Sequence, residues 1–123
     1  MKSRVEVIKT SVLGDFIELD IYIDHDYEEV LVGTISVDKD GYLDVSYDNF
    51  FLVHRKNLFE KGKKALLENG LVDILGDEDA KIYIEGRQTC EDFDPVRYER
   101  AEQYIKDHNL EVENLDDEDI LKI

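Results

Sequence analysis

The sequence has little of several things that would narrow its class directly. Cys90 is the only cysteine among the 123 residues, so no disulfide can form within the chain, and a reducing compartment is expected. Pro95 is the only proline, and no stretch rich in glycine, serine or proline divides the chain. No uncharged apolar run approaches a membrane span, and no charged-then-apolar signal segment precedes Val5. We therefore expect a cytoplasmic protein that makes no contact with a membrane.

Basic residues are also scarce. Fifteen Lys and Arg stand against 31 Asp and Glu, which gives a formal net charge of −16. Nucleic acids and anionic membrane surfaces attract basic proteins, so we expect this chain to bind neither directly. A small domain needs only about two to eight net charges to stay dissolved. The excess therefore predicts that the negative charge has a function.

The charge is unevenly distributed along the chain. Residues 1–50 carry twelve acids and four bases, residues 51–72 carry two acids and five bases, and residues 73–123 carry seventeen acids and six bases. A short basic segment thus separates two acidic ones. We interpret residues 1–110 as a single domain and residues 111–123 as an acidic C-terminal segment.

The first half of the sequence alternates as β-strands do. Ile17, Leu19, Ile21 and Ile23 are separated by single polar residues, the period of two that is typical of a half-buried strand. A polar loop is expected over residues 25–29, and a tight turn at residues 38–41, where Gly41 supplies a positive φ. The strands are expected around residues 5–7, 17–23, 30–37 and 43–47.

Helix signals follow. Asn57 and Glu60 resemble a capping box, and Asn69-Gly70 is typical of a helix end. Asp94-Pro95 favours the start of a second helix, and Lys81 to Glu85 alternates like a short strand. The residues expected on the inner face of the second helix are Tyr98, Ala101, Ile105 and His108. The predicted fold is α+β, an antiparallel β-meander sheet with two helices and an acidic C-terminal tail.

No motif for catalysis, metal binding or phosphate binding is complete. An EF-hand aligned on Asp38 and Asp40 would place Tyr47 where a bidentate carboxylate is needed, so a hairpin turn explains these residues better. Asp24-His25-Asp26 has no partner ligands at zinc spacing, and the acids next to Cys90 disfavour a reactive thiolate. Glycine-rich phosphate loops are absent from the sequence. We expect no enzyme activity, no metal and no cofactor.

Rows of carboxylates are the most informative feature. Residues two apart on a strand lie about 6.7 Å from one another, a spacing comparable to that of phosphates along a nucleic-acid strand. Like charges on neighbouring strands destabilise a sheet, and aspartate is a poor strand former. A surface without a function would therefore not be expected to carry such rows. The residues expected to contact a partner are Glu18, Asp20, Tyr22 and Asp24, then Tyr42, Asp44 and Asp48, and finally Asp116, Asp117, Glu118 and Asp119.

In its size, acidity and lack of catalytic motifs, the chain resembles the small acidic anti-defence proteins of phages and mobile elements, of the anti-CRISPR or anti-restriction type. The resemblance covers general character and rests on no aligned motif. It implies an inhibitor that mimics nucleic acid in the host cytoplasm and blocks the basic nucleic-acid-binding surface of a nuclease, such as a CRISPR effector. An immunity protein for a nuclease toxin would use the same mechanism.

A different class of function stays open. The chain could be a structural or adaptor domain that binds through an apolar patch, for which the run from Phe50 to Val53 is the candidate. Burial of that run as a strand is the alternative interpretation. Oligomeric state is left open by the sequence.

Overall fold

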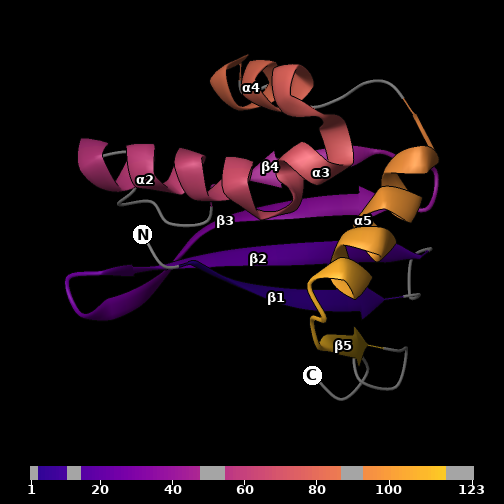
Figure 1. The fold of residues 1–123 in the computed structure, drawn as a ribbon, viewed down its shortest axis with the longest axis horizontal. Helices are drawn as coiled ribbons and strands as arrows, with labels where there is room; N and C mark the ends of the chain where they lie inside the picture. Colours follow the sequence, from indigo (N-terminus) through magenta and orange to yellow (C-terminus); the bar gives the residue numbers. More distant parts are fainter. Residues whose placement is uncertain (1–2, 11–14, 48–54, 87–92, 116–123) are drawn as a thin grey trace.

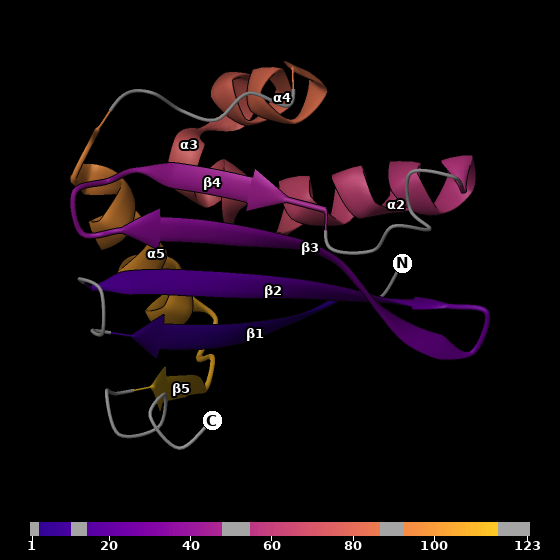
Figure 2. The ribbon, with the colours of Figure 1, turned by 180° about the vertical axis from the view of Figure 1, so that it is seen from behind.

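One five-stranded sheet organises the α+β fold; the helix Asp77–Gly86 lies beyond one edge of the sheet, and the other described helices lie over one of its faces (Figures 1 and 2). The computed structural model describes residues 3–10, 15–47, 55–86 and 93–115. The strands are β1 (Ser3–Thr10), β2 (Phe16–His25), β3 (Glu28–Asp38), β4 (Leu43–Ser46) and β5 (Val112–Leu115). The helical elements are α2 (Lys56–Leu66), the irregular turn η1 (Leu67–Leu71), α3 (Val72–Leu75), α4 (Asp77–Gly86) and α5 (Val96–Asp107).

The sheet is mixed, with the strand order β4-β3-β2-β1-β5. Strands β1 to β4 pair with their neighbours in sequence and are antiparallel, whereas β5 pairs with β1 in parallel, with Val7 opposite Val112. The prediction of a purely antiparallel sheet is therefore too simple. Four residues of the predicted acidic tail form β5, because Val112 packs against the core in spite of the acids beside it.

The core lies between the sheet and the helices. Ile17, Leu19, Ile21 and Ile23 are buried on the helix-facing side of β2, as their alternation predicts. The helical elements contribute buried side chains that include Leu66, Leu71, Ile74, Tyr104 and Ile105. Each fully buried aliphatic side chain stabilises the fold by about 1.5–3 kcal/mol.

The two hairpin turns differ from each other. At residues 38–41, the Gly41 N–H donates to the Asp38 carbonyl at 2.9 Å and Gly41 has a φ of 90°, as expected. At the other turn the polar loop predicted over residues 25–29 is much shorter. Only Asp26 and Tyr27 connect β2 to β3, because both adopt positive φ values, of 49° and 66°. This is the backbone that closes a two-residue hairpin.

The first predicted helix ends where the sequence indicates but begins differently. Gly70 has a φ of 88°, and the Asn69 side-chain amide donates to the Ala65 carbonyl at 2.7 Å. The N-cap is Arg55, with no side-chain capping bond, so the capping box predicted at Asn57 is wrong. Asn57 already lies within the first turn of α2.

The strand predicted over Lys81 to Glu85 is wrong, because these residues lie in α4. Ala80, Tyr83 and Ile84 are buried at helical spacing, whereas Ile82 is 64% exposed. The Tyr83 hydroxyl donates to the Leu43 carbonyl at 2.9 Å and ties α4 to β4. Alternation over five residues cannot distinguish a strand from a helix whose buried residues are three and four apart.

The second predicted helix is α5. The N-cap of α5 is Pro95, one residue after the predicted Asp94, and Asp94 accepts a hydrogen bond from the Val96 N–H at 3.2 Å. Ala101 and Ile105 are buried as expected, and Tyr98 is half-buried. Tyr104 is buried although the pattern does not single it out, and His108 is exposed rather than inward, with its ring 4.1 Å from that of Tyr104.

Candidate functional site

The candidate site is the face of the sheet that the described helices leave uncovered, which we call the open face (Figure 2). Its side chains alternate with the buried ones of the same strands, so strand pairing places them side by side. Positions on it include Glu6 on β1, Phe16, Glu18, Asp20 and Tyr22 on β2, Asp38 on β3 and Asp44 on β4.

The predicted β2 row lies on this face. Glu18, Asp20 and Tyr22 are half-buried, and Asp24 is exposed near the end of the strand. Asp20 accepts a hydrogen bond from the Thr34 hydroxyl at 3.0 Å and lies opposite Glu6 in the pairing of β1 with β2. Two carboxylates directly opposite each other destabilise a strand pair, so this arrangement costs stability.

One arginine is embedded in the row. The Arg4 guanidinium lies 4.5 Å from the centre of the Tyr22 ring, and it binds Glu6 through Nη1 at 2.6 Å and Glu29 through Nε at 2.9 Å. These hydrogen bonds, that to Glu29 first, raise the pKa of Arg4 above its already high value, and they lower the pKa of Glu29. Burial, followed by the charges of Glu6 and Asp20, raises the pKa of Tyr22.

The sequence does not indicate that Arg4 binds Tyr22, Glu6 and Glu29 together, an arrangement that we call the Arg4 clamp. Arg4 and Glu6 alternate with Val5 and Val7, so their shared face was readable, but Glu29 joins them only through the pairing of β2 with β3. The Arg4 guanidinium lies over the Tyr22 ring, so Tyr22, which was expected to contact a partner, makes a contact within the chain.

A hollow of about 510 Å³ opens at the other end of the open face. It is lined by Phe16 and Tyr42 together with Asp38, Asp40 and Asp44. Tyr42 lies just before β4, where its backbone N–H donates to the Asp38 carboxylate at 2.9 Å and its ring lies 5.8 Å from that of Phe93. Asp15 and Lys39 also line the hollow, and they pair with each other at 3.5 Å. The predicted residues Tyr42 and Asp44 therefore meet around one hollow.

Cations are concentrated away from this face. Of the twelve Lys and Arg that the structure describes, nine lie in the helices or directly before one. Lys9 of β1 points to the helix side, where it binds Glu102 of α5 at 3.4 Å. Among the described strand residues, Arg4 is thus the one basic side chain on the open face. The nine helical cations are Arg55, Lys56, Lys61, Lys63, Lys64, Lys81, Arg97, Arg100 and Lys106.

Several predicted positions lie outside the described residues. These are Asp48, Asp116, Asp117, Glu118 and Asp119, together with Cys90 and the apolar run from Phe50 to Val53.

The described residues offer no evident metal centre. Within residues 3–10, 15–47, 55–86 and 93–115, no three His, Cys, Asp or Glu side chains are grouped so that they could hold a metal ion. His25, from the Asp24-His25-Asp26 cluster, has its Nε2 3.3 Å from Asp26 and its Nδ1 3.5 Å from the Lys61 Nζ. In the same part of the chain, no helix combines the length and apolar character needed to cross a membrane.

Comparison with protein-family models, with curated proteins and with solved structures finds no match to this chain.

Proposed function

We propose that the protein is an acidic, non-catalytic inhibitor that occupies the basic nucleic-acid-binding surface of a partner protein. The observation that carries the proposal is the segregation of charge. Glu6, Glu18, Asp20, Asp38 and Asp44 share the open face, and the described cations lie mostly on the helix side. A face with an excess of one sign of charge steers a partner of the other sign and makes association fast and salt-sensitive.

The hollow at Phe16 and Tyr42 gives the open face a specific contact in addition to its charge. A hollow lined by aromatic rings and carboxylates suits an arginine side chain, because a ring can stack on the guanidinium plane and a carboxylate can accept its N–H groups. Asp44 lines this hollow, and no ion pair joins it to another described residue. Aromatic side chains in such positions are frequent hot spots of protein interfaces.

The partner that fits best is a nuclease, because nucleases present a basic groove for the polyanion that this face mimics. A CRISPR effector is the target that the resemblance to anti-defence proteins implies, and the inhibitor would then act in the host cytoplasm. A nuclease toxin bound by its immunity protein would present the same chemistry. In each case the protein binds protein and does not bind nucleic acid.

A second candidate is an adaptor domain that binds through apolar surface. The observation that favours it is the exposure of Ile82, Phe93 and Val96, of which the first two are each 64% exposed. Binding of this kind would depend little on salt, because burial of apolar area does not weaken on screening.

The test is capture of proteins from a nuclease-containing lysate on the immobilised protein, at about 50 mM and about 200 mM salt, with and without competing DNA. We expect capture of a basic nucleic-acid-binding protein that is lost at the higher salt and displaced by DNA. The captured protein, once purified, should cleave nucleic acid and should be inhibited by the free chain.

Two variants with equal change of charge localise the contact. The open-face variant combines Glu18→Gln, Asp20→Asn and Asp44→Asn. The helix variant combines Glu78→Gln, Glu85→Gln and Glu99→Gln, at exposed positions of α4 and α5. Capture that ignores salt and DNA, or that both variants weaken equally, would rule out the open face as the binding surface.

A further inference from the structure

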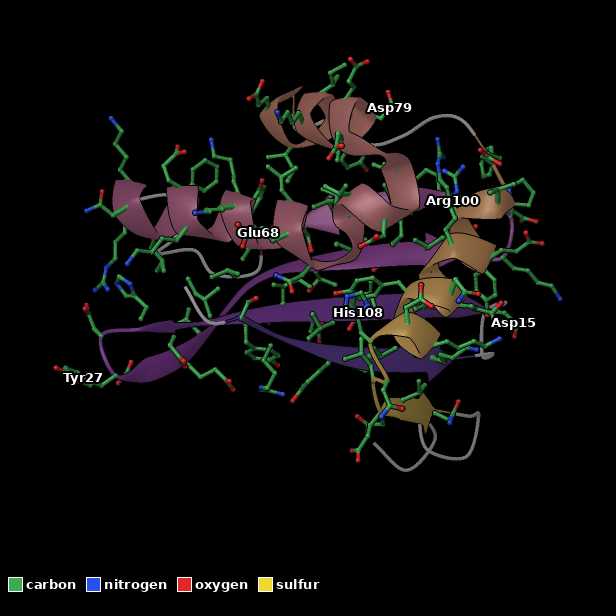
Figure 3. All side chains as sticks on the ribbon, in the orientation of Figure 1. Asp15, Tyr27, Glu68, Asp79, Arg100 and His108 are labelled. Atoms are coloured by element: carbon green, nitrogen blue, oxygen red, sulfur yellow. The ribbon has the colours of Figure 1, made fainter. Side chains whose placement is uncertain are left out.

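The hairpin of β2 and β3 extends past the other strands and ends at Tyr27 (Figures 1 and 3). Among the described residues, β1 pairs with β2 only as far as Ile23, and beyond it β2 pairs with β3. Tyr27 is fully exposed, and Figure 3 shows its side chain pointing away from the molecule. The fold gains no burial from this ring.

The backbone at Tyr27 is also unfavourable for its residue type. Its φ of 66° lies in the left-handed region, where the second position of a two-residue hairpin turn favours glycine. Neither the turn nor the core explains a tyrosine at this position. A contact outside the chain is a direct explanation for a large ring that is both exposed and strained.

The open face shows what this combination of side chains binds. Arg4 places its guanidinium on the Tyr22 ring and forms hydrogen bonds to the carboxylates of Glu6 and Glu29. At the tip of the hairpin, Asp24 and Glu28 are exposed on opposite faces, Asp24 opposite Glu29 and Glu28 opposite His25, and no ion pair joins either to a described residue. The hairpin tip thus has a tyrosine and carboxylates, as the Arg4 clamp does, but no described arginine forms an ion pair with these carboxylates.

The other residue of the turn has a different environment. Asp26 lines a hollow together with Arg55, Lys56 and Lys61, and its carboxylate lies 3.3 Å from His25. Asp26 therefore has cations of its own chain nearby, and it is not part of the proposed contact.

We propose that the Tyr27 ring receives an arginine side chain of the basic partner, with the carboxylate of Asp24 on one face of the hairpin or that of Glu28 on the other. This inference rests on the proposed function, and it names the chemical group at one contact. A guanidinium stacks on an aromatic ring and forks to carboxylates, whereas a lysine ammonium is a compact charge that does neither as well. The hairpin tip is thereby a second point of attachment, separate from the hollow at Tyr42.

The test uses two peptides of equal length, an oligoarginine and an oligolysine, titrated into the full chain at low salt by calorimetry. We expect oligoarginine to bind more tightly. Tyr27→Ala should weaken oligoarginine about two- to fivefold and leave oligolysine nearly unchanged. Tyr27→Phe should retain the preference, because the ring carries the contact. Ile82→Ala, which trims another exposed side chain, should change neither affinity.

Other outcomes separate this inference from the proposed function. If the open-face variant weakens both peptides while Tyr27→Ala changes neither affinity, or lowers both equally, the arginine contact at Tyr27 is overturned and the open face stands. If Tyr27→Ala removes the preference for arginine while the open-face variant changes nothing, the contact at Tyr27 stands and the open face fails. Tyr27→Gly should lose the preference and raise the melting temperature, which would show that the loss is not caused by misfolding.

Discussion

Gly41 ties the turn between β3 and β4 to the start of α5. Its φ is 90°, and a Cβ built on it would lie 1.9 Å from the Asp94 carbonyl oxygen. The Gly41 carbonyl in turn accepts a hydrogen bond from Arg97 Nη1 at 3.1 Å. The residue therefore serves both a local turn and a contact between segments more than fifty positions apart in sequence.

Gly41→Ala should destabilise the fold by about 2 kcal/mol or more, because both the backbone conformation and the contact with Asp94 are lost. Urea unfolding measures the effect. Gly76→Ala is the matched control, since Gly76 has a φ of 88° but a Cβ added there would have no atom within 4 Å. This control should cost about 1–3 kcal/mol from its φ of 88° and ψ of 161° alone, and less than Gly41→Ala. Equal losses for the two variants would contradict the role of the Asp94 contact.

Tyr104 makes stability depend on alkaline pH. Burial, and secondarily the charge of Asp73, raises the pKa of Tyr104 from 10.0 to about 12. Because the folded pKa is the higher one, the stabilisation is fully present below pH 10 and is lost as pH rises towards 12. Between these values the wild type should lose stability faster than Tyr104→Phe, which has no proton to release. Parallel pH profiles of the free energy of unfolding would contradict this.

At the scale of elements, α4 is the clearest test of the fold. A strand over Lys81 to Glu85 would bury Ile82 and Ile84 on one face, whereas of these two residues only Ile84 is buried in α4. Ile82→Lys should therefore change the free energy of unfolding by about 0.5 kcal/mol or less, and Ile84→Ala should cost about 2–4 kcal/mol. Thermal or urea unfolding of the two variants gives the answer. Comparable losses would favour the strand.

How much of the fold is predictable depends on how local the signal is. The alternation in β2, the turn at Gly41 and the helix end at Asn69-Gly70 are local, and the structure confirms them. The helical state of α4 and the parallel pairing of β5 depend on what packs against them. In particular, β5 is placed beside β1 only after α5 has crossed the sheet, which no short pattern in residues 112–115 indicates.

The candidate site also has a part that local sequence patterns predict and a part that depends on how the strands pair. Alternation alone places Glu18, Asp20 and Tyr22 on one face, because a strand with one buried side must expose the other. The hollow beside Tyr42 and the clamp around Arg4 need the register of neighbouring strands, which brings residues together from β1, β2 and β3. The sequence indicates only a polar loop around Tyr27, and the two-residue turn shows how exposed this residue is.

At the scale of the whole molecule, the negative charge acts against the fold that carries it. A net charge of −16 repels itself, and Glu6 and Asp20 lie directly opposite each other on β1 and β2. Salt screens such repulsion, so added salt should raise the melting temperature of the wild type.

The open-face variant should be more stable than the wild type at low salt, by a few tenths to about 1 kcal/mol, and should respond less to added salt. The Asn introduced at position 20 can still accept the hydrogen bond from Thr34, so that contact is kept. Melting curves at several salt concentrations measure both effects. A loss of stability in this variant would mean that the open-face carboxylates support the fold rather than serve a partner.

The most direct test of the central claim is inhibition of the captured nuclease by the open-face and helix variants, compared with the wild type at one salt concentration. The two variants remove the same number of charges, so net charge alone cannot separate them. We expect the open-face variant to lose inhibition by about tenfold or more, while the helix variant stays close to the wild type. Equal inhibition by all three proteins, or an equal loss in the two variants, would contradict it.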